Sequence, residues 1–378
     1  MNITASNTDR VRSPINRVET VIVRTRLPRE MRMTHVDGFT EREHVVVRVT
    51  NRDGLIGFGE ASPLTFFTGE TAEGTKFALD RYLGPLTLGR SPHEVSVLHR
   101  TWDRAFPGYR AAKCALDVAL HDLFARSVGL TLADLLGGSE SRHIPIYKAI
   151  GFGPTETVVR EAEELWGLGL RTFKVKVGDD RRQDIENLEN LRARFGDSVN
   201  LIVDANGAFR PQDAVRFLRD SAPYKIAYIE QPVPGWDIEG LSFVRANGGV
   251  PVMADESVYT LRDAVRLIQA GAVDLLGIKL IKTAGLSTAR KIATYAEEFG
   301  VSCVVISPFD TSLGVSASAQ LASTFLPPLE AQGLGTFLVA EGQDLDTLDV
   351  NNGVLTIPSG LGLGVEPDER LFEGAGTV

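Results

Sequence analysis

Hydrophobic and polar residues alternate along the first part of the chain as they do in antiparallel strands. Two such runs, rich in valine, predict strands at 18–27 and 43–61. The NRDG sequence inside the second run predicts a hairpin turn. Apolar residues at helical spacing then predict three helices, at about 70–84, 91–105 and 109–128. Strands followed by helices indicate an α+β domain, which we assign to residues 15–140.

From residue 143 the pattern changes to short β-rich runs separated by helical segments. Eight runs predict strands, at 144–150, 172–177, 201–205, 226–230, 250–256, 275–280, 303–307 and 336–340. Regular alternation of strand and helix over about 200 residues is typical of a (β/α)8 TIM barrel. We therefore predict a barrel domain over 141–341. We expect residues 1–14 to be a disordered tail and the Gly- and Pro-rich segment 342–378 to pack back on the front domain.

Composition narrows the class of protein. The 378 residues are 43% apolar and 24% charged, with a net charge of −9, so no basic excess is present to bind nucleic acid. We find neither an apolar run that could span a membrane nor a signal-peptide core, and we expect a cytoplasmic location. Cys114 and Cys303 are the only cysteines, which indicates neither a disulfide framework nor a thiolate metal site.

A charged residue stands at the C-terminal end of each of several predicted barrel strands, where the chemistry of such barrels takes place. These residues come at intervals of 24 to 28 along the chain: Lys176, Asp204, Glu230, Asp255 and Lys279. Lys174 shares a strand with Lys176, and positions two apart on a strand point to the same side. Scattered surface charge would not follow the strand repeat, so we expect these side chains to meet at the barrel mouth.

Three of these residues predict a metal site. Asp204, Glu230 and Asp255, called the acidic trio below, would repel one another unless a cation lay between them. Their oxygen ligands favour Mg²⁺, with Mn²⁺ as a substitute. Zinc is not expected, because none of the six histidines lies at a barrel strand end.

The lysines would then carry the proton chemistry. A dication and a second ammonium nearby favour the neutral amine, so Lys176 or Lys279 could act as a general base. Lys174 and the metal would stabilise negative charge on a substrate carboxylate as it becomes an enediolate. Each residue also has a structural interpretation, because a strand-end Asp can cap the next helix and a Lys-x-Lys pair can lie on a solvated edge strand.

Three other polar residues are interpreted as structural. Lys282 lies three positions after Lys279 and is expected to face away from the site. Glu256, next to Asp255, and His121, within a predicted helix, are assigned to the framework.

The sequence around the charged residues matches known motifs: FKVKVG, VDANGA, IEQPVPGWDIEGL, VMADES and GIKLIK, preceded by GFGEA and ALDVALHDL. These motifs resemble those of the enolase superfamily, in its muconate lactonizing enzyme (muconate cycloisomerase) subgroup, over nearly the whole chain after residue 15. The resemblance implies a modified (β/α)7β barrel with an α+β capping domain. It also implies that the acidic trio binds the metal, that Lys176 and Lys279 are the acid/base pair on opposite faces of the substrate, and that Lys174 supports its carboxylate.

The subgroup contains cycloisomerases, N-acylamino acid racemases, dipeptide epimerases and o-succinylbenzoate synthases. The resemblance therefore implies a Mg²⁺-dependent enzyme that acts on a small carboxylate through a metal-stabilised enediolate. Our first hypothesis is a muconate-type cycloisomerase, followed by a racemase or epimerase and then by a dehydratase. A non-catalytic ligand-binding barrel is the alternative from another class, although all five strand-end charges are present. We also expect a homo-oligomer.

The sequence also departs from the subgroup's patterns. Dipeptide epimerases are expected to hold the free ammonium with Asp-x-Asp at the last barrel strand, but LEAQGLGTFLV has no such pair and DLD at 344–346 comes later. TAGL replaces the Gly-Gly that often follows the sixth-strand lysine. ISPFDTSLG is similar to succinylbenzoate synthases and makes Asp310 a substrate-binding candidate. His35 and Phe66, the latter beside Phe67, are candidates to shape the pocket from front-domain loops.

Overall fold

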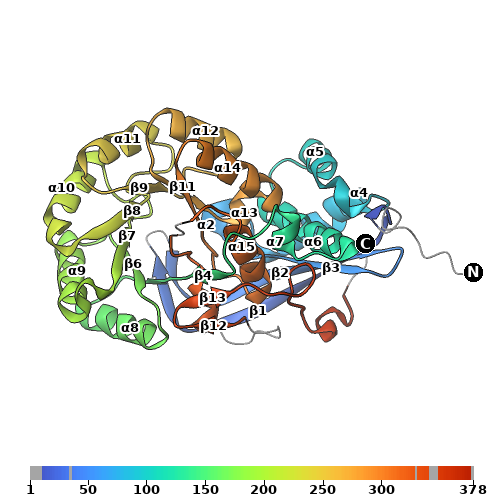
Figure 1. The fold of residues 1–378 in the computed structure, drawn as a ribbon, viewed down its shortest axis with the longest axis horizontal. Helices are drawn as coiled ribbons and strands as arrows, with labels where there is room; N and C mark the ends of the chain where they lie inside the picture. The colour runs from blue at the N-terminus through green and yellow to red at the C-terminus, as the bar shows by residue number, and fades with distance from the viewer. Residues whose placement is uncertain (1–10, 34–35, 328–329, 340–347, 376–378) are drawn as a thin grey trace, which may run out of the picture.

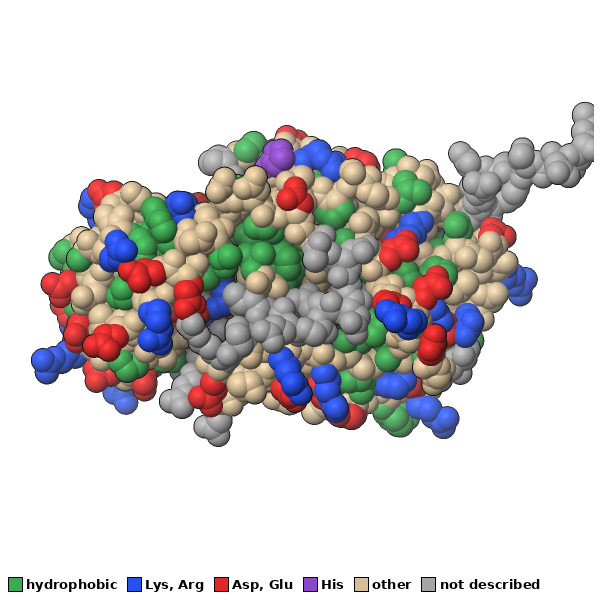
Figure 2. Space-filling model, turned by 90° about the horizontal axis from the view of Figure 1, so that it is seen from below, with side chains coloured by type: hydrophobic (Ala, Val, Ile, Leu, Met, Phe, Trp, Pro, Cys, Tyr) green, Lys and Arg blue, Asp and Glu red, His purple; other side chains and the backbone are tan. Residues whose placement is uncertain are grey.

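The computed structural model describes residues 11–33, 36–327, 330–339 and 348–375, so residues 1–10 of the predicted tail lie outside it. A three-stranded antiparallel sheet with its helices lies beside a curled sheet of seven parallel strands (Figure 1). Among the helices of the described ranges, none combines the length and the hydropathy that a membrane span requires. Figure 2 shows one face of the molecule, on which basic and acidic side chains are interspersed.

The front of the chain forms the predicted antiparallel sheet. Its strands, in the order β1-β2-β3, are β1 (Ile15–Met33), β2 (Val36–Asn51) and β3 (Ile56–Ala61). Valine suits a packed, pleated surface, and Val45, Val47 and Val49 are fully buried. The NRDG turn is confirmed, and Gly54 there has a φ of 79°, which favours glycine.

The three helical regions predicted for this domain are confirmed, and two further short helices lie at Thr65–Thr68 and Leu132–Leu135. In chain order the helical elements are α2 (Thr65–Thr68), α3 (Ala72–Ala78), the π-helical turn η1 (Leu79–Leu83), α4 (Gly84–Thr87), the 3₁₀ turn η2 (Pro92–Glu94), α5 (Val95–Ala105), α6 (Arg110–Val128) and α7 (Leu132–Leu135). Helix α6 lies against β3. A Cβ on Gly57 would be 2.3 Å from the carbonyl oxygen of Ala119, and one on Gly59 would be 2.1 Å from that of Ala115. The glycines of GFGEA therefore permit the close approach of strand and helix.

Seven parallel strands form the barrel wall, in the order β11-β10-β9-β8-β7-β6-β5. They are β5 (Lys148–Ile150), β6 (Thr172–Lys176), β7 (Asn200–Asp204), β8 (Ile226–Glu230), β9 (Val252–Ala254), β10 (Leu275–Ile278) and β11 (Ser302–Val305). The helices are α8 (Thr155–Gly167), α9 (Arg181–Phe195), α10 (Pro211–Ser221), α11 (Ile238–Asn247), α12 (Leu261–Gln269), α13 (Leu280–Thr283), α14 (Leu286–Glu298) and α15 (Ser312–Ala322). The long helices surround the strands (Figure 1), which confirms the barrel with a separate α+β domain.

The prediction of an eighth strand in the run TFLVA is wrong. Gly335–Val339 form a 3₁₀-helix, and the chain completes the barrel just before it, where Gln332 and Gly333 make parallel bridges to Ile146 and Ile306. A two-residue bridge is too short to show an alternating pattern. The apolar residues that follow it belong to a helical turn, so their β propensity was misleading.

The C-terminal segment contacts both domains. Strands β12 (Val350–Asn351) and β13 (Val354–Thr356) pair antiparallel, and β13 also pairs with β4 (His143–Pro145), just before the first barrel strand. Farther along, the backbone N–H of Leu363 donates to Asp122 of α6 at 2.7 Å. These hydrogen bonds join the C-terminal segment to strand β4, just before the first barrel strand, and to helix α6 of the capping domain.

Candidate active site

The acidic trio lies at the C-terminal ends of three neighbouring barrel strands. Asp204 ends β7 and Glu230 ends β8, and the two are paired in the parallel register, while Asp255 directly follows β9. Parallel neighbours end at the same edge of a sheet, so the three side chains come together there. All three are at most 1% exposed. The strand repeat seen in the sequence therefore corresponds to a cluster of buried charge.

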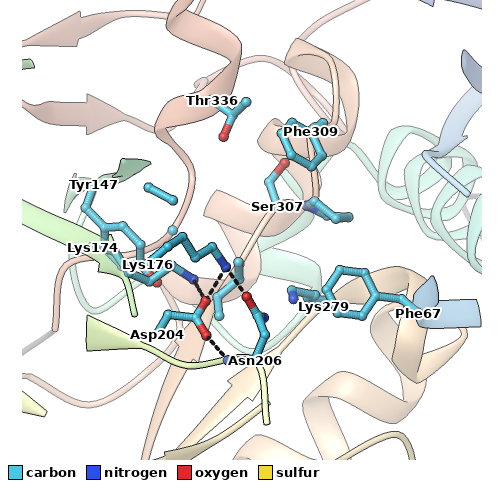
Figure 3. Close-up of a pocket in the computed structure, with 14 residues that line it drawn as sticks. Phe67, Tyr147, Lys174, Lys176, Asp204, Asn206, Lys279, Ser307, Phe309 and Thr336 are labelled. Atoms are coloured by element: carbon cyan, nitrogen blue, oxygen red, sulfur yellow. Dashed lines mark hydrogen bonds and ion pairs between the residues drawn. The ribbon is translucent and has the colours of Figure 1, made fainter. Parts of the chain in front are cut away.

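Two lysines of β6 bind this cluster. Lys174 donates to the two carboxylate oxygens of Glu230 at 3.0 and 2.9 Å, and its Nζ lies 3.1 Å from Asp204 Oδ2. Lys176 donates to the same Asp204 oxygen at 2.7 Å and to Asn206 Oδ1 at 2.5 Å (Figure 3). Their two-residue spacing puts both ammonium groups on one side of β6.

Two further lysines bind Asp255. Lys279, directly after β10, donates to Asp255 Oδ2, and Lys282 donates to Oδ1 at 2.5 Å and to the Asp255 carbonyl oxygen. The prediction that Lys282 faces away is wrong. The chain turns into helix α13 straight after Lys279, so the residue three positions later returns to the same side.

Burial and charge act against each other in this cluster. Burial raises the pKa of Glu230 to about 8, assisted by the negative charge of Asp204 and opposed by Lys174. Burial would also raise the pKa of Asp204, but Lys176 and Lys174 hold it below its ordinary value. Asp255, likewise buried, has a lowered pKa because of its two lysines. The lysines thus compensate the negative charge of Asp204 and Asp255 more fully than that of Glu230. The negative charge that remains would be balanced by a further cation.

The acidic trio has the chemistry of a Mg²⁺ site. Three buried carboxylates supply only oxygen donors, which a hard cation prefers. Within the described ranges, no three acidic, His or Cys side chains already surround a common point closely enough to hold an ion, and lysine ammonium groups bind the carboxylates instead. The donor set and the raised pKa of Glu230 fit a metal ion that would replace some of these lysine contacts. Ligation by the trio stays a prediction.

A cavity of about 540 Å³, open to solvent, lies beside the cluster. Its charged lining consists of Lys174, Lys176, Asp204 and Lys279. The rest of its lining is uncharged: Phe67, Tyr147, Ala149, Asn206, Ile306, Ser307, Pro308, Phe309, Gly333 and Thr336. One part of the cavity lining is therefore charged, and the rest is largely apolar (Figure 3).

Lys176 and Lys279 reach this cavity from different sides. Their strands, β6 and β10, are separated in the sheet by three others. Figure 3 shows Lys176 next to Asp204 and, across from them, Lys279 next to Phe67. The Nζ atom of Lys279 is 3.7 Å from the centre of the Phe67 ring, a distance at which an aromatic face attracts a cation. Two amines therefore face one cavity, each with its own partners.

For the residues of the capping domain that were predicted to shape the pocket, the structure differs from the prediction. Phe67 lines the cavity, whereas Phe66 is not among the lining residues and packs on Phe67 with 4.6 Å between ring centres. In the short helix α2 consecutive side chains point in different directions, and the sequence alone could not decide between the two rings. His35 lies outside the described residues.

Asp310 lies behind the cavity wall instead of lining it. Its backbone N–H donates at 2.9 Å to the hydroxyl of Ser307, which does line the cavity. Burial and the nearby carboxylate of Glu60 raise the pKa of Asp310 to about 7. Phe309 has a φ of 88°, and this backbone turn gives the cavity position to Phe309 and places the next residue elsewhere.

Asn206 is a site residue that sequence reasoning missed. It accepts from Lys176, and its Nδ2 donates to Glu256 at 2.8 Å. Glu256 thereby supports a residue of the cavity, in keeping with its structural interpretation. The signal was present in VDANGA, because Asn206 lies two positions after Asp204.

The barrel, its capping domain and the buried lysine–carboxylate cluster define a class of enzyme, and comparison with known proteins gives the family. The model of the mandelate racemase / muconate lactonizing enzyme N-terminal domain matches residues 16–137, and that of the enolase C-terminal domain-like family matches residues 157–371. The chain belongs to the enolase superfamily, in its muconate lactonizing enzyme-like subgroup. This confirms the resemblance found in the motifs, and the chain is an enzyme.

Relatives with different activities are similar to this chain at comparable identity. The L-Ala-D/L-Glu epimerase of Bacillus subtilis is 37% identical over 285 residues, which cover 75% of this chain and 78% of that protein. A chloromuconate cycloisomerase of Cupriavidus pinatubonensis is 34% identical over 362 residues, 94% of this chain and 97% of that protein. The crystal structure of a dipeptide epimerase from Enterococcus faecalis, complexed with Mg and the dipeptide L-Leu-L-Tyr, has a TM-score of 0.88 at 30% identity and covers 93% of this chain and 99% of that one.

Proposed function

We propose that this enzyme racemises or epimerises an N-acylated amino acid by moving the proton on the carbon next to its carboxylate. The observation that carries the proposal is the pair of amines, Lys176 and Lys279, that face one cavity from β6 and from the end of β10. Inversion at a carbon needs one group to take the proton and a second group, on the other side, to return one. The proposal gives each lysine one of these steps.

Lys174 is the proposed anchor of the substrate carboxylate. Its ammonium lines the cavity and already binds carboxylates, those of Asp204 and Glu230, and it would stabilise the charge that develops as the proton leaves. Lys176 or Lys279, as the neutral amine, takes the proton, and the other lysine, as the ammonium, gives one back. The reverse reaction exchanges their roles. Mg²⁺ bound by the acidic trio, with Mn²⁺ as a substitute, would add positive charge beside the substrate carboxylate.

The uncharged wall favours an N-acyl substituent over a free amine. Among the described residues, Asp204 is the only carboxylate that lines the cavity, and both Lys174 and Lys176 bind it. A free ammonium would therefore find no further acid among the described lining residues. An acyl amide could pack against Phe67 and Phe309 without leaving a charge unpaired.

Muconate-type cycloisomerisation, the first hypothesis from the sequence, is the second candidate. It is supported by the cycloisomerase relative that covers 94% of the chain. That reaction would use one lysine for proton transfer and leave the other without a step. The second carboxylate of muconate would also meet the uncharged wall, and for these reasons we place this reaction second.

The experiment incubates the enzyme with Mg²⁺ in D₂O and a panel of carboxylates. The panel contains N-acetyl and N-succinyl amino acids, dipeptides with a free N-terminus, and cis,cis-muconate. We expect deuterium at the α-carbon of N-acyl substrates and the appearance of both enantiomers. Loss of muconate absorbance with lactone formation and no α-exchange would replace the proposal with cycloisomerisation. Exchange confined to dipeptides would keep the reaction and reject the substrate class.

A further inference from the structure

The geometry points to Tyr259 as a positioning residue that holds Phe67 of the capping domain against Lys279. The inference rests on the proposed function, in which Lys279 exchanges a proton with the substrate. Tyr259 belongs to the barrel, in the loop between β9 and α12, and Phe67 belongs to α2. The Tyr259 hydroxyl donates to the Phe67 carbonyl oxygen at 2.8 Å. This hydrogen bond joins the two domains next to an amine of the cavity.

Phe67 depends on contacts outside its own helix. Helix α2 has four residues, has no side-chain N-cap and ends at Gly69, whose φ is 73°. A helix this short does not hold its conformation alone. The Phe67 ring is nevertheless 8% exposed and lies over the Lys279 ammonium. The barrel must therefore supply part of the restraint, and the Tyr259 hydroxyl provides a direct bond to the Phe67 backbone.

Tyr259 is itself anchored on the barrel side. Its backbone N–H donates to Asp263 in the first turn of α12 at 3.2 Å, and its carbonyl oxygen accepts from Arg110 at 3.4 Å. Arg110 also donates to the carbonyl oxygen of Lys282 at 3.2 Å. The ring centre lies 5.3 Å from the Lys282 ammonium. The hydroxyl thus extends from a fixed loop, and its bond sets the position of α2.

Loss of this hydrogen bond is expected to affect proton transfer through only one of the two lysines. If it is lost, the Phe67 ring can move off Lys279, which changes the orientation of that amine and admits water beside it. Lys176 lies across the cavity, where it is held by Asp204 and Asn206. Proton transfer through Lys279 should slow, and proton transfer through Lys176 should continue.

The test is the variant Tyr259→Phe, which keeps the ring and removes only the hydroxyl. Each enantiomer of an N-succinyl amino acid that the wild type racemises is incubated separately in D₂O, and its initial α-proton exchange is measured. The variant Lys279→Ala identifies the enantiomer that depends on Lys279. We expect Tyr259→Phe to slow exchange of that enantiomer about tenfold, the cost of one lost hydrogen bond, and to leave the other within about twofold. Equal slowing of both enantiomers would overturn the inference.

Two further variants sharpen the result. Tyr295→Phe is the matched control, because Tyr295 is half-buried in α14 and its ring contacts Phe299; it should alter neither enantiomer. In a Phe67→Leu background, adding Tyr259→Phe should change little further, since both changes act through the same ring. Full additivity of the two losses would contradict the inference.

A measurement without substrate separates this inference from the proposed function. Amide hydrogen exchange over residues 65–69 should be faster in Tyr259→Phe than in the wild type, because α2 has lost its bond to the barrel. Unchanged exchange there would overturn the positioning role, whatever the reaction proves to be. A wild type that exchanges none of the substrates would instead overturn the proposed function and leave this readout in force.

Discussion

Two buried clusters each contain aspartate and glutamate carboxylates, but these carboxylates have different kinds of partner. At the barrel mouth, the acidic trio binds lysine ammonium groups. At the seam between capping domain and barrel, two carboxylates bind the backbone N–H groups at the starts of barrel helices. Glu60 accepts from Thr311 at 3.0 Å and from Gly314 at 2.9 Å, and Asp117 accepts from Leu286 at 2.6 Å. Lysine side chains are the main partners at the barrel mouth. The seam carboxylates bind main-chain N–H groups in addition to histidine side chains.

The kind of partner separates a reactive cluster from a structural joint. Backbone donors at a helix start cannot leave without unwinding the helix, and the helix dipole favours the anion there. A lysine ammonium on its flexible stem can rotate away and give its place to a metal ion or a substrate. The barrel-mouth cluster also borders the cavity. Its partners are exchangeable, so its charges are available for chemistry.

Substitution of either lysine of the proposed acid/base pair should reduce activity more than any other substitution. Removal of the amine in Lys176→Ala or Lys279→Ala should lower the rate of racemisation by about 10²–10⁴-fold, the usual contribution of a general acid or base. Circular dichroism should show a folded barrel in both variants. Lys225→Ala, which removes an exposed ammonium, is the control and should keep wild-type activity. Full activity in either cavity variant would reject the assigned roles.

Removal of the metal is expected to have a comparable effect on activity. Dialysis against EDTA should reduce turnover at least about 100-fold, because the developing negative charge loses its strongest counter-charge, and added Mg²⁺ should restore it. Calorimetry should detect Mg²⁺ binding to the wild type and a large loss of affinity in Glu230→Gln, which removes one charge of the acidic trio. A metal-free preparation with full activity would refute the metal site.

Substitutions at the seam are expected to lower the stability of the fold more than the rate of the reaction. Asp117 accepts from Leu286 at the start of α14, and His99 binds its other oxygen at 2.7 Å. Asp117→Ala leaves these buried donors without a partner and should lower the free energy of unfolding by about 3 kcal/mol. Urea titration measures this loss. A change below about 0.5 kcal/mol would show that the seam bonds do not stabilise the fold.

The stability lost in Asp117→Ala is also expected to depend on pH. Burial would lower the pKa of His121, but the Asp117 carboxylate raises it above its ordinary 6.5. Burial would raise the pKa of Asp117, but His121 and His99 hold it below 3.8. The His121 contribution is complete below pH 6.5 and is lost as the pH rises through its folded pKa, whereas that of Asp117 is lost as the pH falls below 3.8. The stability difference between wild type and Asp117→Ala should therefore be largest between pH 3.8 and 6.5.

The smallest expected effect is at the surface. The ion pair of Arg194 and Glu163, with an N–O distance of 2.6 Å, has side chains 58% and 44% exposed. Water screens such a pair, so Arg194→Ala should change the free energy of unfolding by less than about 1 kcal/mol. The same urea titration measures this difference. A loss as large as that of Asp117→Ala would contradict the distinction between exposed and buried partners.

Much of the fold and of the charged cluster could be predicted from the sequence because both follow the chain's own repeat. One charged residue per strand–helix unit makes a pattern in one dimension, and parallel strands that end at one edge bring those residues together. The same regularity located the strands of the barrel wall. Asn206 does not follow this rule, because it is uncharged and lies two residues after the end of β7.

The remaining features depend on where one element ends or on contacts between distant segments. Lys282 could not be placed without the helix that begins after Lys279, and Asp310 could not be placed without the backbone turn at Phe309. Tyr259 and Phe67 are 192 positions apart, and no local pattern joins them. The metal ligation, the domain boundaries and the homo-oligomer stay predictions.

The roles of the two lysines can be measured separately, by α-proton exchange of single enantiomers in D₂O with Lys176→Ala and with Lys279→Ala. If two amines serve the two faces of one carbon, each variant should still exchange one enantiomer with retention of configuration. The two variants should retain opposite enantiomers, and in both of them racemisation should be much slower than this exchange. A variant that exchanges both enantiomers, or two variants that retain the same one, would contradict the account.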